Sequence, residues 1–195
     1  MLWAMNSLEK SLVQAWELLT NGIRDRNVMF HLAKIATVTL DGRPTQRTVV
    51  LRDADAESRQ LRFHTDQRST KVREIANNPA VSVLFYDPET QVQIRIDGDA
   101  TVHAGDAVAE AAWAETRHFS KACYLAPNAP GTPVSEPPVA PSYDADEDQI
   151  AYENFCAVVI SVSRLEWMHL AVQGHKRAQF NWDNAGRLEM SWISP

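Results

Sequence analysis

The sequence contains little cysteine, no long hydrophobic run and no excess of positive charge. Its two cysteines, Cys123 and Cys156, stand far apart and form no CxxC pattern, so we expect reduced thiols rather than a disulfide framework or a zinc site. No stretch approaches the roughly 20 apolar residues of a membrane span, and the N-terminal residues do not resemble a secretory signal. These absences predict a cytoplasmic protein without a membrane partner.

The net charge and the absence of known catalytic motifs exclude further classes of protein. The chain carries a formal net charge of -6, whereas a general nucleic-acid binder has a basic surface. Any positive site must therefore be local, within an acidic surface. The sequence has no G-x-S-x-G pattern. His169 and His175 lack a carboxylate at metal-ligand spacing, so we expect no metal.

Length and composition indicate a single domain over residues 1–195. The chain has 195 residues, 45% of them hydrophobic and 23% charged, which suffices for one sizeable core. Residues 127–141 contain six of the ten prolines, and the acidic DADEDQ follows soon after. We therefore expect a Pro-rich surface loop over about 127–150. This loop covers a site, reaches a partner subunit or simply connects two elements.

Hydrophobic periodicity and turn residues predict mostly antiparallel strands. Ser7 can cap an N-terminal helix, and Asp41-Gly42 indicates a β-hairpin. Strands are expected over residues 28–40, 45–53, 59–65, 80–86, 91–103, 154–170, 176–182 and 187–193. Short helices are expected over residues 69–79 and 105–119. The absence of βαβ alternation favours a β-barrel with flanking helices.

Two cations and a row of hydroxyl groups stand where elements begin, which points to an anion. Arg47 lies near the start of a predicted strand, and Ser69, Thr70 and Lys71 occupy the first turn of a predicted helix. Free amide groups and the positive end of the helix dipole favour a phosphate at such a place. Arg47 and Lys71 would together roughly neutralise a phosphate dianion. The alternative is that both are solvated surface cations.

Five segments, in this order and spacing, resemble the core of the pyridoxamine 5'-phosphate oxidase-like FMN-binding proteins. They are RTVVLR, FHT, STK, NNPAVSVLFY and QIRIDGDATV. The resemblance covers residues 31–103 and returns in RLEWMHLAVQGHKRAQF. It implies a mainly β fold, namely an antiparallel split β-barrel with flanking helices. It also implies FMN as the cofactor and a homodimer with FMN at the interface.

The resemblance implies roles for individual residues as well. Arg47, with Ser69 and Lys71, would hold the FMN phosphate, and Gln93 would bond the flavin from a neighbouring strand. A tryptophan and an arginine spaced like Trp167 and Arg177 would reach FMN from the partner chain. The residues expected to contact FMN are Arg47, Thr48, Val49, Val50, Leu51, Arg52, His64, Thr65, Ser69, Thr70, Lys71, Gln93, Trp167 and Arg177.

Several positions depart from the family pattern. Thr70 stands where the family has the arginine of Ser-Arg-Lys, and Gln173 stands where a leading arginine grips the substrate. The family's mid-chain Tyr-x-x-x-Arg-x-x-x-Ser set is matched only by Trp113, Arg117 and either Ser120 or Lys121. These departures bear on vitamin B6 turnover more than on FMN binding.

The sequence therefore predicts an FMN-dependent oxidoreductase that acts on a small-molecule substrate. Arg52, Arg117 and His175 are the candidate substrate contacts. Two alternatives remain open at this point. One is a non-catalytic FMN-binding or regulatory protein that uses the Pro-rich loop to engage a partner, and the other is a split-barrel reductase that uses a deazaflavin.

Overall fold

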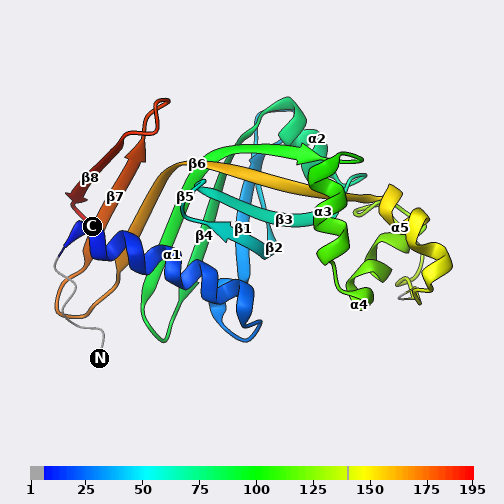
Figure 1. The fold of residues 1–195 in the computed structure, drawn as a ribbon, viewed down its shortest axis with the longest axis horizontal. Helices are drawn as coiled ribbons and strands as arrows, with labels where there is room; N and C mark the ends of the chain where they lie inside the picture. Colours follow the sequence, from blue (N-terminus) through cyan, green and yellow to red (C-terminus); the bar gives the residue numbers. More distant parts are fainter. Residues whose placement is uncertain (1–6, 140) are drawn as a thin grey trace.

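Six antiparallel strands close into a β-barrel in the computed structural model, which describes residues 7–139 and 141–195 (Figure 1). The strand order is β3-β2-β1-β4-β5-β6, and pairing between β3 and β6 closes the barrel. These strands are β1 (Leu32–Val38), β2 (Pro44–Asp55), β3 (Gln60–Asp66), β4 (Ala80–Asp87), β5 (Val92–His103) and β6 (Phe155–His169). The expected antiparallel split barrel with flanking helices is confirmed.

The sheet continues beyond the barrel because β6 is long enough to serve two partners. Its first half pairs with β3 and its second half with β7 (Lys176–Trp182), which pairs in turn with β8 (Leu188–Ile193). Between the two halves the register of β5 and β6 shifts after Asp97. A Cβ added at Gly98 would lie 2.1 Å from the Ser161 carbonyl oxygen, so only glycine allows this close approach.

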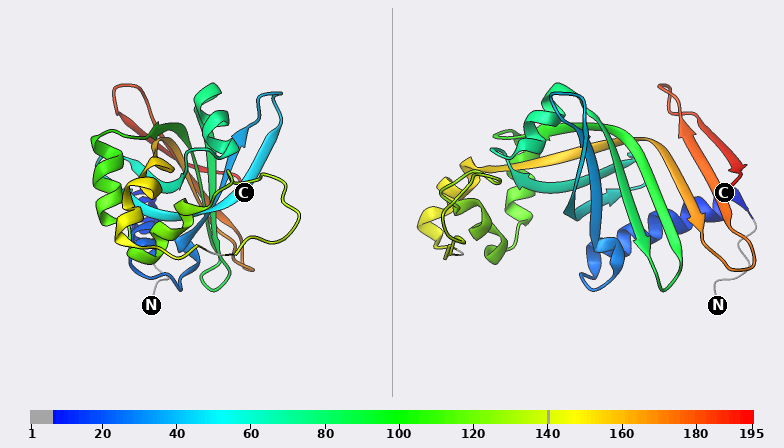
Figure 2. Two further views of the ribbon diagram at one scale, coloured as in Figure 1. Left: turned by 90° about the vertical axis from the view of Figure 1, so that its right-hand side faces the viewer. Right: turned by 180° about the vertical axis from the view of Figure 1, so that it is seen from behind.

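The helices cover the outside and the ends of the barrel. Figures 1 and 2 show α1 running across the side of the sheet toward β7 and β8, while α3, α4 and α5 gather at the other end of the molecule. The helices are α1 (Leu8–Arg24), η1 (Met29–His31), α2 (Thr70–Asn77), α3 (Ala107–Glu115), α4 (His118–Lys121), η2 (Ala122–Leu125), η3 (Ala145–Glu147) and α5 (Asp148–Glu153). No helix among the described residues is long and apolar enough to cross a membrane.

Two apolar clusters stabilise these parts. The larger one fills the barrel and includes Trp16 of α1. The smaller one lies beneath α3 and α5 and contains Trp113, Tyr124 and Phe155. Trp113 therefore belongs to a core, and its Nε1 donates to Asp148 at 3.0 Å.

Local capping and turn signals were reliable guides to the fold. Ser7 accepts a hydrogen bond from the Lys10 amide at the start of α1. The Asp106 side chain accepts one from the Ala109 amide at the start of α3. Gly42 has a φ of 83° in the hairpin between β1 and β2, which is the left-handed conformation that the Asp-Gly turn requires.

Two predicted boundaries were wrong. The strand expected over 28–40 begins only at Leu32, because Phe30 is buried and η1 packs against α1, where His31 Nδ1 lies 2.7 Å from the Gly22 carbonyl oxygen. The Pro-rich loop expected to extend to about residue 150 ends earlier, since η3 begins at Ala145. Asp144 and Glu147 form a capping box there, and a capping box is a strong helix-start signal.

Candidate functional site

The start of α2 gathers one ammonium group and two hydroxyl groups. Lys71 Nζ donates to Thr65 Oγ1 at 2.8 Å and to Ser69 Oγ at 3.1 Å. Ser69 is the N-cap residue of α2, but its side chain makes no capping hydrogen bond. Thr70 is exposed. The first turn of α2 therefore presents a half-buried cation whose hydrogen-bond partners are neutral.

Arg47 reaches the same region from β2. Its guanidinium lies close enough to Lys71 to lower the pKa of that ammonium group, an effect second only to burial. Arg47 Nη1 donates to Thr37 Oγ1 at 2.5 Å, and Nη2 donates to Glu74 Oε2 at 2.8 Å. The two predicted phosphate ligands thus lie in one electrostatic environment, with Glu74 as an acidic neighbour.

These groups fit a phosphorylated ligand. A guanidinium has five N–H donors, and Arg47 uses two of them on the described residues. The other three, together with the Lys71 ammonium, are available to phosphate oxygens, which accept charge-assisted hydrogen bonds. Arg68 does not join them, because it forms an ion pair with Asp66 at 2.6 Å.

β2 leads from this cationic region to a cleft. Arg47 and Arg52 are five residues apart on β2, which corresponds to about 16 Å at the rise of a β-strand. Leu51 is buried in the barrel, and Val49 packs against the same core. Thr48 is exposed and Val50 is half-buried on the other face of β2. The β2–β3 register shifts between Leu51 and Asp53, so Arg52 lies in a β-bulge. Bulges re-aim side chains, and Arg52 lines the cleft.

The cleft has a volume of about 630 Å³ and lies between the α1–η1 turn, β2, β3 and the α3–α4 junction. Five of its lining residues are arginines, against two acidic residues. They are Arg24, Arg26, Arg52, Arg62 and Arg117, with Asp25 and Glu115. Arg62 is paired with Glu115 at 2.6 Å. The side chains of Arg52 and Arg117 make no ion pair with any described residue. The cleft is therefore a local basic site in an acidic protein.

His64 lines the cleft as a neutral imidazole. Burial, followed by the charges of Arg62 and Arg52, lowers its pKa to about 3. The Thr116 hydroxyl donates to the Ala112 carbonyl oxygen at 2.8 Å and lies 3.3 Å from His64 Nδ1. Since that hydroxyl proton is engaged, Nδ1 carries the ring proton and donates to Thr116. Nε2 then has a lone pair, and it has no partner among the described residues.

Gln93 and Arg177 lie on the outer face of the sheet, on either side of one β6 residue. Gln93 pairs with Met168 on β6, and Met168 pairs with Arg177 on β7. Arg177 Nη2 donates to Glu166 Oε2 at 2.6 Å. This face also carries Arg95, which is bonded to Glu166 at 2.7 Å.

Trp167 does not join Arg177. Its ring is 4% exposed and Nε1 donates to Gln14 Oε1 of α1 at 2.9 Å. Neighbouring residues of a strand face opposite ways, so Trp167 points to the core side of the sheet, whereas Met168 shares the outer face with Arg177. Within one chain, Trp167 and Arg177 therefore lie on opposite faces of the sheet.

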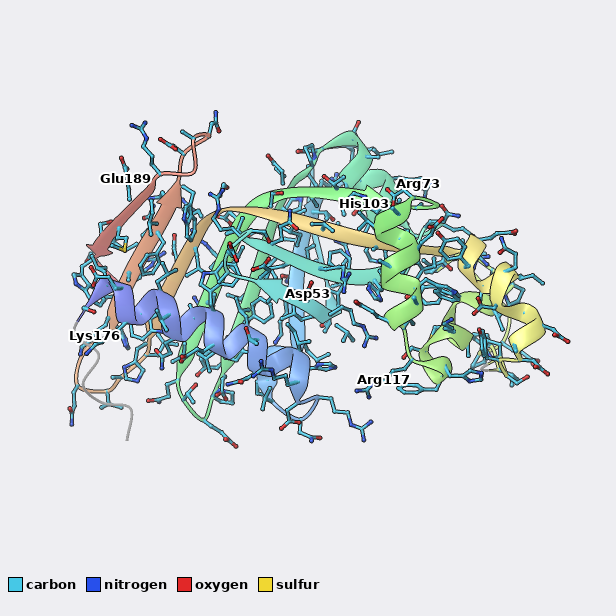
Figure 3. All side chains as sticks on the ribbon, viewed as in Figure 1. Asp53, Arg73, His103, Arg117, Lys176 and Glu189 are labelled. Carbon is cyan, nitrogen blue, oxygen red and sulfur yellow. The ribbon has the colours of Figure 1, made fainter. Side chains whose placement is uncertain are left out.

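The three expected substrate contacts do not all meet within one chain. Arg52 and Arg117 line the same cleft, as does Ser120. His175 is exposed in the loop before β7. Figure 3 shows its neighbour Lys176 at the left edge of the molecule and the cleft residue Arg117 well apart from it, below α3. Within one chain, His175 is not among the residues that line the cleft.

Lys121 and Trp113 also lie away from this cleft. Lys121 Nζ stands 4.3 Å from the centre of the Trp113 ring and bonds Asp148 at 2.8 Å. Both residues therefore act in the smaller core, and of the mid-chain set only Arg117 and Ser120 reach the cleft.

Sequence reasoning missed Glu74 and the Arg24–Asn27 side of the cleft. Glu74 follows Lys71 by three residues, which places both on one face of a helix. That signal indicates a carboxylate near Lys71, but it does not reveal the contact with Arg47, 27 residues away. Nothing in the local sequence connects the α1–η1 turn with Arg117.

The chain matches the family "Pyridoxamine 5'-phosphate oxidase, FMN-binding domain" over residues 13–104. A pyridoxine/pyridoxamine 5'-phosphate oxidase 2 of Arabidopsis thaliana is 26% identical over 93% of this chain and 96% of its own length. A pyridoxine/pyridoxamine 5'-phosphate oxidase of Rubrobacter xylanophilus is 42% identical, but over 43% of this chain and only 36% of its own length.

Solved structures share the fold. A pyridoxamine 5'-phosphate oxidase-related, FMN binding protein of Nostoc punctiforme superposes with a TM-score of 0.75 at 25% identity, over 94% of this chain and 96% of the other. PhzG from Burkholderia lata, in complex with tetrahydrophenazine-1-carboxylic acid, gives a TM-score of 0.72 at 20% identity, over 98% and 95%. The chain is therefore similar to the pyridoxamine 5'-phosphate oxidase-like, FMN-binding split-barrel proteins, by a family model over residues 13–104 and by a relative and a solved structure over nearly its whole length.

Proposed function

We propose that this single-domain protein binds FMN and is a flavin-dependent oxidoreductase for a small anionic substrate. The observation that carries the proposal is that Arg47 of β2 reaches α2, where it donates to Glu74, three residues after Lys71 on the same helix. The Arg47 charge also lowers the pKa of Lys71, and two cations in one region, with three guanidinium N–H groups to spare, favour an anion there. Similarity to the FMN-binding family makes the FMN phosphate the best candidate.

Residues in two regions of the chain would bind the cofactor phosphate and the substrate, respectively. Arg47, Lys71, Ser69 and Thr65 would hold the phosphate, since these groups supply charge and hydrogen bonds there. Bound FMN would supply the hydride acceptance that side chains lack. Residues Thr48–Arg52 run from this region to the cleft, which places the cleft at a suitable distance for a substrate.

The cleft favours an enzyme over a purely binding protein. Arg52 and Arg117, which form no ion pair within the described part of the chain, suit a phosphate or carboxylate group. Pyridoxamine phosphate is the first substrate to test because of the relatives' names. His64 is neutral, so it would accept a hydrogen bond rather than add another charge.

We further propose a homodimer with the flavin at its interface. Arg177 lies on β7 and His175 in the loop before it, and neither lines the cleft of its own chain; their neighbour Lys176 lies well apart from Arg117 in Figure 3. In a two-fold interface, a residue i of one copy contacts a residue j of the other, and j of the first copy contacts i of the second. Arg177 and His175 of one copy would then complete the site of its partner.

The test is an absorbance spectrum of the purified protein, titration of the flavin-free protein with FMN, and an assay with pyridoxamine phosphate under air. A yellow protein, or one that takes up FMN, supports the cofactor assignment. A colourless protein that binds no added FMN would refute it. Oxidation of pyridoxamine phosphate would identify the substrate, whereas FMN binding without turnover of any anionic substrate would favour a non-catalytic role.

Arg52→Gln and Arg117→Gln test the substrate part separately. Each should raise the KM for an anionic substrate by about tenfold or more, because a charge-assisted contact contributes about 1.5–3 kcal/mol. FMN affinity should stay unchanged for Arg117→Gln. Arg43→Gln is a matched control, since Arg43 lies exposed in the β1–β2 turn. Equal KM values for all three variants would argue against the cleft as the substrate site.

A further inference from the structure

Glu74 lies in the proposed phosphate site but has the wrong charge for a phosphate ligand. Its side chain is 3% exposed. Its Oε2 accepts hydrogen bonds from Thr37 Oγ1 at 2.6 Å and from Arg47 Nη2 at 2.8 Å. A buried carboxylate beside an anion site repels the anion. Its presence there therefore calls for a second role.

We propose that Glu74 is a positioning residue, which fixes the Arg47 guanidinium in the orientation that binds the FMN phosphate. The inference rests on the proposed function, because it concerns the same phosphate site. Glu74 itself would not touch the cofactor, and it would act only through Arg47.

The contacts form a closed triangle, which is why the orientation is fixed. Arg47 donates to both Thr37 and Glu74, and Thr37 donates to Glu74. A planar guanidinium bonded through both of its terminal nitrogens cannot rotate freely. The three remaining N–H groups then point in set directions before any ligand arrives, and preorganisation of this kind increases affinity.

Two substitutions of Glu74 separate the effect of its negative charge on FMN affinity from the effect of its hydrogen bond to Arg47. Glu74→Gln and Glu74→Ala remove the same negative charge, but only glutamine keeps an oxygen that can accept from Arg47 Nη2. Any effect of the lost charge on FMN affinity is common to both variants. The difference between them reports positioning alone.

The experiment compares the affinities of the two variants for FMN and for riboflavin, which lacks the phosphate. We expect Glu74→Ala to bind FMN about tenfold more weakly than Glu74→Gln, the value of one hydrogen bond to a charged group. Riboflavin should bind both variants equally. A merely structural role would change riboflavin affinity as well.

The same pair in an Arg47→Ala background shows whether Glu74 acts through Arg47. In that background the two variants should bind FMN equally, because the group being positioned is gone. Equal FMN affinities of the two single variants, or a difference that persists without Arg47, would overturn the inference. If the wild-type protein shows no preference for FMN over riboflavin, the phosphate site itself is refuted, and the positioning role falls with it.

Discussion

Removing Arg47 should destabilise the protein more than removing Arg47 and the charge of Glu74 together. The side chains of Arg47 and Glu74 are 23% and 3% exposed, so the pair lies largely out of water. Arg47→Ala leaves Glu74 with a single described hydrogen-bond donor, Thr37. Loss of one member of a buried ion pair costs about 3–5 kcal/mol, because the remaining charge is uncompensated.

The second variant, Arg47→Ala with Glu74→Gln, removes both charges. The free energy of unfolding of this double variant should fall by only about 1 kcal/mol, the net contribution of an ordinary hydrogen bond. For a chain of this size, the single variant should therefore melt about 6–20 °C below the wild type, and the double variant should recover most of that loss.

The assay is urea and thermal unfolding of the flavin-free proteins at neutral pH, so that cofactor binding plays no part. Arg73→Ala is the control, since Arg73 is an exposed arginine one residue before Glu74 on the same helix (Figure 3). Equal stabilities of the single and double variants would refute the reasoning, because they would mean that the unpaired carboxylate at position 74 costs nothing.

Three further predictions concern other parts of the molecule. Lys71→Met should weaken FMN binding by about 1.5–3 kcal/mol in a titration, but leave riboflavin binding unchanged. Because burial lowers the pKa of Lys71, wild-type FMN affinity should fall as the pH rises into the alkaline range, and Lys71→Met should lack this fall. Burial raises the pKa of Asp148, but hydrogen bonds, the first from Lys121, outweigh it and bring that pKa from 3.8 to about 2. This stabilisation is present above pH 3.8 and lost as the pH falls through about 2, and Asp148→Asn should remove that dependence in acid unfolding curves. Gly98→Ala should cost about 1–3 kcal/mol in urea unfolding, because its Cβ would meet the Ser161 carbonyl oxygen; unchanged stability would contradict the close approach of β5 and β6.

The sequence predicts most reliably the contacts between residues that are close together in the chain. Lys71 contacts Ser69, two residues away, so a helix-start pattern is enough to place both together. Strand alternation also places Leu51, which is buried, and Arg52 on opposite faces of β2. Such local relations follow from the helix and strand periods alone.

The sequence alone does not predict contacts between distant segments or the exact register of the strands. The partner of Arg47 is 27 residues away on α2, and the cleft joins the α1–η1 turn to Arg117. On β6, a displacement of one residue exchanges the two faces of a strand. Spacing along the chain therefore does not reveal that Met168, and not Trp167, lies opposite Arg177.

The two basic regions differ in how their arginines are held, and this difference matters for what each can bind. Arg47 is tied to Thr37 and Glu74 before any ligand is present, whereas the side chains of Arg52 and Arg117 have no ion-pair partner among the described residues. A guanidinium that is already fixed loses little side-chain entropy when a ligand binds, but it can bind the ligand in only one geometry. A guanidinium without such contacts loses more entropy, but it can adjust to the position of the ligand. The site on α2 thus suits a ligand that is always the same, as a cofactor is. Under the proposed function, the cleft would suit substrates whose anionic group varies in position. Discrimination among such substrates would then depend less on these two arginines than on the walls of β2 and β3.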